Sequence, residues 1–264
     1  MCRLAGYVGR RPISLSTLLY DPPHSLQHAA YAPKELLWGH VNVDGTGVAW
    51  WVEGRSEPLR YVTDKSPWSD PNLPDLAPML AGTPVLAAVR SATPGIPHGP
   101  QNVAPFVSGG LAAVHNGWIG GFRDGIGRSL LATMSDARFG EITSMNDSLV
   151  LFHLVAQQLD DEPGMELLDA VAEVIRQVAK TVTAAHGAAA LNLVVASESS
   201  IVASRTSAGT TVNTLYTLRT DAGSWVASEP LDASDPWEPV PEHRMAILTE
   251  ETIEIVPLDH EGVP

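Results

Sequence analysis

The sequence predicts an α+β protein in which helices pack on largely antiparallel sheets. Short apolar strand patterns occupy both ends of the chain, and the two clearest helical patterns lie between them. This order lacks the regular alternation of strand and helix that is typical of a parallel sheet. The 22 Gly and 21 Pro residues add many potential turns, which favours short elements over long helices.

The predicted strands are rich in Val, Ile, Ala and Trp and are bounded by Gly, Pro, Asn or Asp. They cover residues 3–8, 47–52, 84–90, 111–115, 189–196, 201–204, 215–218, 224–227, 245–248 and 252–256. Trp50 and Trp51 are adjacent on one of these strands. Because successive strand side chains point to opposite faces, we expect one indole to face the core and the other to face outward.

Two segments carry clear helical periodicity. Apolar residues recur three and four positions apart in residues 147–159, and Asn146 or Asp147 can cap the first turn. Residues 165–185 carry an apolar stripe from Leu168 to Val182. Weaker patterns predict helices over residues 14–19 and 24–30.

Two segments are predicted to be surface loops. Residues 64–78 are rich in Pro, Asp and Ser, and residues 232–241 contain three prolines in ten positions. Apolar strand patterns resume on both sides of each segment, so neither has the character of an interdomain linker. We therefore expect one domain over residues 2–264.

Net charge argues against two classes of partner. The chain has 16 Lys and Arg against 30 Asp and Glu, a formal net charge of −14. Proteins that bind nucleic acid or anionic membranes use basic surfaces, so we expect neither as a partner. No apolar run approaches the roughly 18 residues that cross a bilayer, and no secretory signal is visible, so we expect a cytoplasmic protein.

The single cysteine limits the metal chemistry that is available. One thiol cannot form an internal disulfide, a thiolate zinc site or an iron–sulfur cluster. His24 and His28 are four residues apart, but no acidic third ligand accompanies them. No glycine-rich loop of nucleotide-binding type follows a strand. We expect no metal and no cofactor.

The position of Cys2 indicates a possible nucleophile. Removal of Met1, which a small second side chain permits, would give Cys2 both a thiol and a free α-amine. An α-amine with a pKa of about 8 can accept a proton near neutral pH, so one residue would hold nucleophile and base. The alternative is an ordinary buried cysteine on a first strand, and position alone favours it.

Two further motifs could bind a substrate. Arg90 ends a predicted strand and precedes a turn that contains Thr93, so its guanidinium could hold a carboxylate or could pair with a surface acid. His115, Asn116 and Gly117 follow an apolar strand and are predicted to open a turn. The Asn116 amide and the Gly117 N–H could stabilise an oxyanion, although Asn-Gly is also a common tight-turn pair.

Asp147 stands where the first long helix is predicted to begin. Its carboxylate could hold a substrate ammonium group or could simply cap the helix, and capping is the commoner use of aspartate there. Each motif is weak alone, so their order along the chain carries the interpretation.

That order resembles class II glutamine amidotransferases, which are N-terminal-nucleophile hydrolases. The resemblance covers roughly residues 2–235 and rests on MCRLAGY from residue 1, NVDGTG from 42, RSATPG from 90, HNG from 115 and NDS from 146. The segments DPPH from residue 21, YAP from 31 and ASEPL from 227 look most like the γ-glutamyl amidohydrolase branch of ergothioneine biosynthesis.

The resemblance implies a fold and a catalytic centre. The fold is a four-layer αββα sandwich of the N-terminal-nucleophile hydrolase type. Cys2 would be the nucleophile, and the Asn116 side chain with the Gly117 backbone N–H would form the oxyanion hole.

The resemblance also implies a binding site for a γ-glutamyl group. Arg90, helped by the turn around Thr93, would hold the α-carboxylate, and Asp147 would hold the α-ammonium group. His115 belongs to the same motif and is predicted to contribute to substrate binding.

These roles predict a γ-glutamyl amidohydrolase acting on a small γ-glutamyl–cysteinyl compound such as the hercynine sulfoxide intermediate. Two alternatives remain open. One is a glutaminase subunit that supplies ammonia to a separate synthase, and the other is a catalytically inactive binding module that retains Met1. The leaving group and the oligomeric state are not predicted.

Overall fold

The computed structural model describes residues 2–37, 39, 41–92 and 96–258. One of its two large sheets has seven strands in the order β14-β12-β13-β1-β6-β3-β4. In that order the strands are Glu238–Pro239, Tyr216–Thr220, Gly223–Ala227, Arg3–Gly9, Val85–Val89, Thr46–Trp50 and Leu59–Thr63. The N-terminal strand β1 therefore lies in the middle of this first sheet, paired antiparallel with β13 and β6.

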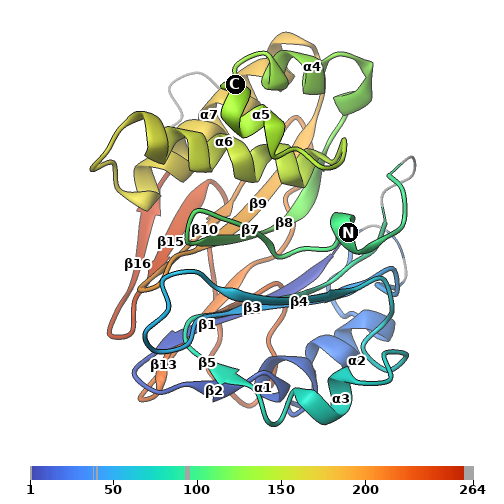
Figure 1. Cartoon of the computed structure of the whole chain (residues 1–264), viewed down its shortest axis with the longest axis vertical. Helices are drawn as coiled ribbons and strands as arrows, with labels where there is room; N and C mark the ends of the chain where they lie inside the picture. The colour runs from blue at the N-terminus through green and yellow to red at the C-terminus, as the bar shows by residue number, and fades with distance from the viewer. Residues whose placement is uncertain (1, 38, 40, 93–95, 259–264) are drawn as a thin grey trace.

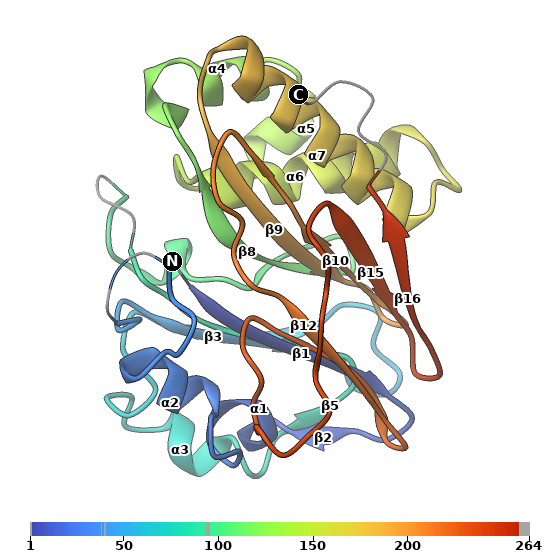
Figure 2. The same ribbon diagram turned by 180° about the vertical axis from the view of Figure 1, so that it is seen from behind.

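The second large sheet has the order β16-β15-β10-β9-β8-β7, with β11 paired to β9 (Figure 2). These strands are Ile253–Pro257, Arg244–Leu248, Ile201–Arg205, Ala189–Ala196, Leu111–Ile119, Phe106–Ser108 and Ser207–Ala208. Two short strands, β2 (Ile13–Ser14) and β5 (Ala81–Gly82), form a separate pair. The described strand pairs are antiparallel, which confirms the predicted sheet type.

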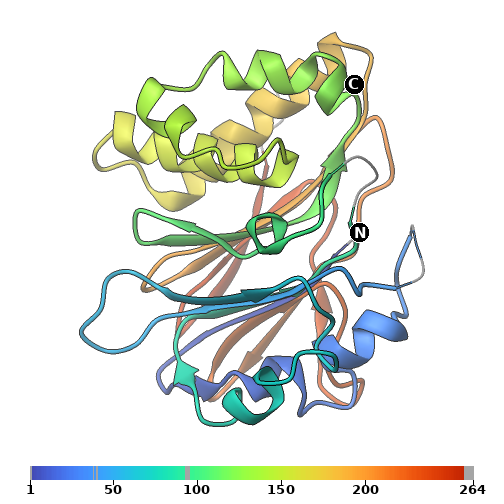
Figure 3. The same cartoon turned by 45° about the vertical axis from the view of Figure 1, so that its right-hand side comes forward.

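Helices cover the outer face of each sheet (Figure 1). Below the first sheet in that view lie α1 (Ser16–Leu19), α2 (Leu26–Tyr31) and α3 (Leu73–Leu76). Above the second sheet lie α4 (Ile126–Leu131), α5 (Asp136–Gly140), α6 (Asp147–Asp161) and α7 (Leu167–Ala184). Two short 3₁₀ turns cover Pro100–Asn102 and Phe122–Asp124. Figure 3 shows the resulting order of helix, sheet, sheet and helix, which confirms the αββα sandwich.

Three apolar cores separate the four layers: one between the sheets and one between each sheet and its helices. Trp51 belongs to the core between the sheets, and Trp50 packs under the helices of the first sheet. Their exposed fractions are 1% and 6%. The expectation that one indole faces outward is therefore wrong, because α1–α3 cover the face that the sequence left open.

The main local differences from the predicted elements lie in loops and turns. Residues 64–78, predicted to be a loop, contain α3, and residues 232–241 contain β14. The predicted turn at His115–Gly117 is wrong, because β8 continues to Ile119 and pairs with β9 throughout. Within the described residues, no helix is both long and apolar enough to span a membrane.

Candidate active site

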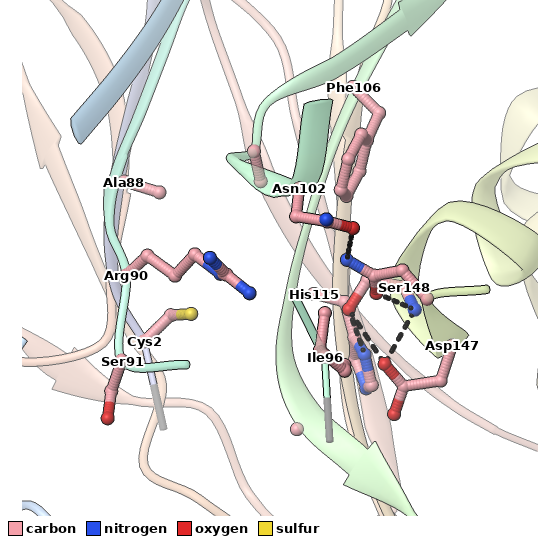
Figure 4. A pocket seen from close by; sticks show the side chains of 13 residues that line it. Cys2, Ala88, Arg90, Ser91, Ile96, Asn102, Phe106, His115, Asp147 and Ser148 are labelled. Atoms are coloured by element: carbon pink, nitrogen blue, oxygen red, sulfur yellow. Dashed lines mark hydrogen bonds between the residues drawn. The ribbon is translucent and has the colours of Figure 1, made fainter. Parts of the chain in front are cut away.

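One pocket brings together most of the predicted site residues. It is lined by Cys2, Ala88, Arg90, Ser91, Ile96, Asn102, Ala104, Phe106, His115, Gly117, Asn146, Asp147 and Ser148. Figure 4 shows the Cys2 thiol and the Arg90 guanidinium directed from the first sheet into this pocket. His115 and Asp147 lie on its opposite side. Thr93, the remaining predicted substrate-binding residue, lies outside the described residues.

Cys2 immediately precedes β1, and its side chain is half-buried. Leu4, two residues further on, belongs to the core between the sheets. Because side chains two apart on an extended strand share a face, Cys2 also faces the space between the sheets. The thiol is therefore presented to the second sheet while remaining accessible from the pocket.

Arg90 follows β6 and is 6% exposed. Its Nη2 lies 3.4 Å from the Pro97 carbonyl oxygen, a long contact, and its buried Nη1 has no hydrogen-bond partner in the part of the chain that the structure describes. Among the described residues Arg90 forms no ion pair. Burial lowers the pKa of Arg90 and outweighs the opposing effect of the Asp44 charge. A buried guanidinium with an unused donor can bind a carboxylate through two N–H groups.

His115 is buried, and both its ring nitrogens have partners. Nε2 lies 2.9 Å from the Ala190 carbonyl oxygen, to which it donates, and Nδ1 lies 3.0 Å from Ser148 Oγ. Burial lowers the pKa of His115, which outweighs the opposing effects of Asp147 and of the Ala190 hydrogen bond. A neutral imidazole that donates through Nε2 must accept at Nδ1. His115 therefore joins β8 to α6, and both of its ring nitrogens are directed at groups other than Cys2.

Asn116 lies beside the pocket but not in its lining. Its side chain is fully buried, and its amide atoms Nδ2 and Oδ1 have no hydrogen-bond partner among residues 2–37, 39, 41–92 and 96–258. It follows Val114 by two residues on β8, and Val114 belongs to the core between the sheets, so Asn116 faces the same space as Cys2. An unpartnered buried amide is costly unless something binds it, so this donor is suited to a developing oxyanion.

Gly117 presents its backbone N–H at the free edge of β8. Gly120 N donates to Ala188 O, while Leu191 N donates to Thr206 O on the other side of β9. In an antiparallel pair these bonds alternate, so the Gly117–Leu191 pair is not hydrogen-bonded and the Gly117 N–H points away from β9. A side chain here would also collide, because a Cβ on Gly117 would overlap the carbonyl oxygen of Ala190.

Asp147 is the first residue of α6, and Asn146 is its N-cap, with the Asn146 side chain accepting from Ser148 N. The carboxylate of Asp147 also has structural partners. Oδ2 accepts from Ile119 N at 2.9 Å, and Oδ1 accepts from Ser148 N at 2.8 Å. Since a carboxylate has about four acceptor sites, these bonds fix its orientation and leave capacity for a ligand in the pocket.

Two buried asparagines that the sequence analysis did not single out support this site. Asn213 Nδ2 donates to the backbone oxygen of Asn116 at 2.7 Å, and Asn192 Nδ2 donates to Asn213 O at 3.0 Å. Asn102 also lines the pocket, where its Oδ1 accepts from Asn146 Nδ2. No local sequence pattern identifies these residues as part of the site, because their partners are distant in the chain and come together only in the folded structure.

The histidine pair at the start of α2 gains the acidic partner that its sequence neighbourhood lacks. His24 Nε2 lies 2.7 Å from Glu229 Oε2, and His24 Nδ1 lies 2.8 Å from His28 Nδ1. Each ring thus has a hydrogen-bonded neighbour. Across the described residues, no group of three or more His, Cys, Asp or Glu is arranged to hold a metal ion.

Comparison with known proteins gives relatives along the whole chain, although no family model matches. A protein of Mycobacterium tuberculosis named γ-glutamyl-hercynylcysteine sulfoxide hydrolase is 31% identical over 264 residues, covering 100% of both chains. A similarly named protein of Mycolicibacterium smegmatis is 31% identical, covering 98% of this chain and 100% of its own.

A solved structure of a class II glutamine amidotransferase domain protein from Silicibacter pomeroyi matches with a TM-score of 0.70 and 24% identity, covering 97% of this chain and 99% of that one. That likeness supports the fold alone, whereas the full-length sequence relatives establish kinship. The chain belongs to the family of γ-glutamyl-hercynylcysteine sulfoxide hydrolases, which have the fold of class II glutamine amidotransferases.

Proposed function

We propose that this protein is an amidohydrolase that cleaves the γ-glutamyl amide of γ-glutamyl-hercynylcysteine sulfoxide, with Cys2 as its nucleophile. The observation that carries the proposal is the pocket in which the Cys2 thiol and the unpaired Arg90 guanidinium face Asp147. The full-length relatives that bear the name of this activity support the choice of substrate.

Substrate binding follows from the two charges on opposite sides of the pocket. The α-carbon of a γ-glutamyl group carries one carboxylate and one ammonium group. The free donors of Arg90 match the carboxylate, and Asp147 matches the ammonium group. A head group held at both charges leaves the γ-carbonyl carbon two methylene groups away, directed toward the thiol of Cys2.

Bond cleavage then requires a nucleophile, a base and an oxyanion hole. The α-amine of Cys2, free once Met1 is removed, takes the thiol proton as Sγ attacks the γ-carbonyl carbon. Asn116 Nδ2 and Gly117 N–H stabilise the oxyanion. Collapse of this intermediate breaks the C–N bond, and the α-ammonium group gives its proton to the departing amine.

Water completes the cycle. It attacks the γ-glutamyl thioester, the α-amine takes one of its protons, and glutamate leaves as the thiol is restored. His115 is a poor replacement for the α-amine, because both its nitrogens are engaged. In this scheme His115 keeps Ser148 and the start of α6 beside the pocket, which is how it contributes to substrate binding.

Steady-state glutamate release tests the proposal. The enzyme, with loss of Met1 verified by intact mass, should have kcat/KM at least roughly 100-fold higher for γ-glutamyl-hercynylcysteine sulfoxide than for glutamine. A preference for glutamine would instead favour the glutaminase subunit. Absence of glutamate release from either compound by the processed protein would favour the inactive binding module.

Retention of Met1 provides an internal control. It converts the α-nitrogen of Cys2 into an amide that cannot accept a proton near neutral pH, while the thiol is unchanged. A preparation that retains Met1 should therefore be inactive. Equal activity of the two forms would mean that a side chain is the base.

A further inference from the structure

A buried ion pair lies behind the nucleophile, on the face of β1 opposite the pocket. Arg3 is fully buried, and its Nη1 donates to Glu229 Oε1 at 2.9 Å. Ala5, two residues along, packs under the helices of the first sheet, so Arg3 faces that layer and not the space between the sheets. The pair therefore cannot touch a substrate in the pocket.

Arg3 nevertheless reaches Cys2 through the backbone. Its Nε donates to the Cys2 carbonyl oxygen at 2.8 Å. Cys2 lies outside β1, and the first residue of a processed chain is prone to fray unless something holds it. This hydrogen bond fixes the peptide group from which the α-amine and the thiol of Cys2 project.

Glu229 in turn fixes Arg3 and a second segment near the pocket. Its carboxylate accepts from His24 Nε2 at 2.7 Å and from the backbone N–H groups of Lys34 and Glu35 at 2.8 and 3.2 Å. Gly39, four residues after Glu35, lies near the pocket. A Cβ built on Gly39 would be 4.0 Å from the Oγ of Ser91, which lines the pocket.

These contacts give Glu229 more partners than a simple ion pair needs. We propose that Glu229, acting through Arg3, is a positioning residue that holds the amine and thiol of Cys2 in the geometry for catalysis. This inference rests on the proposed function, because it assigns the part of the fold that aligns the same nucleophile. Neither residue touches the substrate.

A comparison of single and double variants separates positioning from stability. Arg3→Met or Glu229→Gln alone leaves one buried partner unmatched, which should lower Tm. The double variant removes both charges, so its Tm should exceed that of Arg3→Met, although the new amide loses acceptor capacity toward His24 and the Lys34 and Glu35 N–H groups. It still lacks the donor to the Cys2 carbonyl, so kcat should remain at least tenfold low with KM within twofold.

Two further variants complete the design. Arg3→Lys keeps a charge beside Glu229, but one nitrogen replaces the separate Nε and Nη1 donors, so kcat should stay low. Arg138 is another buried arginine, held by Asp160 at 2.7 Å in the α5–α6 layer. Arg138→Met should lower Tm while kcat stays within twofold of the wild type.

Alkylation of the only cysteine supplies a readout that needs no substrate. The rate of reaction of Cys2 with iodoacetamide near pH 7 should fall at least threefold in Arg3→Met and in the double variant, and should be unchanged in Arg138→Met. If kcat and the alkylation rate recover with Tm in the double variant, the positioning role is refuted. If the wild type releases no glutamate yet this alkylation pattern holds, the proposed function fails while the positioning role stands.

Discussion

Two buried arginines beside the nucleophile show how the same side chain serves two purposes. Arg3 pairs with Val89 in the β1–β6 register, so Arg3 and Arg90 lie at the same end of neighbouring strands. Arg3 faces the helical layer and is paired with Glu229, although its Nη2 also has no hydrogen-bond partner among the described residues. Arg90 faces the pocket and has no carboxylate partner among the described residues.

The difference distinguishes a closed interaction from an open one. Burying a charge is unfavourable unless a partner compensates it, so a folded protein normally supplies that partner. Glu229 supplies it for Arg3. For Arg90 no carboxylate among the described residues forms an ion pair, and the nearby charge of Asp44 offsets its burial only in part, which is the property expected of a side chain that recognises a substrate carboxylate.

The largest expected effect is at Cys2, which Arg3 contacts through the backbone and which lines the pocket with Arg90. Cys2→Ala removes the sulfur atom that would form the thioester, so glutamate release should fall below roughly 1% of the wild-type rate. The substitution is small, and Tm and substrate binding should be nearly unchanged. Calorimetric binding of the intact substrate to the variant checks both points. Substantial residual turnover would indicate another nucleophile.

Arg90 offers the sharpest contrast with Arg3. Arg90→Lys keeps the charge but loses the planar pair of donors. We therefore expect kcat/KM to fall roughly 10- to 100-fold, which corresponds to a loss of about 1.5–3 kcal/mol of transition-state stabilisation. Because no described carboxylate forms an ion pair with Arg90, Arg90→Met should lower Tm less than Arg3→Met does. A Tm loss in Arg90→Met equal to that of Arg3→Met would remove the distinction between the two arginines.

Asp147 tests the opposite wall of the pocket. Asp147→Asn keeps one acceptor oxygen for the Ile119 N–H but loses the negative charge. If the carboxylate binds the substrate ammonium group, kcat/KM should fall about tenfold, which corresponds to about 1.4 kcal/mol of transition-state stabilisation. The Tm should stay within a few degrees of that of the wild type. Kinetics together with thermal unfolding measure both. A change confined to Tm would mean that Asp147 only joins α6 to β8.

The sequence predicted best those elements whose pattern is local. The strand predicted over 189–196 matches β9, and the apolar stripe of residues 165–185 became α7, because burial on regular faces imposes those patterns. The short helices α4 and α5 were not predicted. They have five or six residues each, too few for a clear helical period.

The site was predicted only in part, and for a similar reason. Cys2, Arg90 and Gly117 were identified from motifs, and the structure brings them to one pocket. Asn116 was expected in a turn, because Asn-Gly is a turn signal, whereas pairing with the distant strand β9 keeps it in β8. Glu229 was part of a recognised segment without a role, since its partner Arg3 lies 226 residues away in the chain.

The smallest expected effect is a pH dependence of stability that should be stronger for the Arg3–Glu229 pair than for Arg90. Burial by itself raises the pKa of Glu229, but hydrogen bonds from His24 and the Lys34 N–H, together with the charge of Arg3, lower it from 4.5 to about 2. A carboxyl group whose pKa is lower in the folded protein stabilises the fold above its unfolded pKa. That contribution is lost as the pH falls through the folded value.

The window for this loss therefore runs from about pH 4.5 down to about pH 2. Thermal unfolding of the wild type and of Glu229→Gln should differ most above pH 4.5, and the two Tm values should converge as the pH falls. Carboxyl groups common to both proteins cancel in this difference. Asp44 acts on Arg90 without forming an ion pair with it, so the Tm difference between the wild type and Arg90→Met should change less across the same range. If the Tm difference between the wild type and Glu229→Gln does not shrink on acidification, Arg3 is not paired with a charged carboxylate. The two arginines would then differ only in the direction that their side chains face.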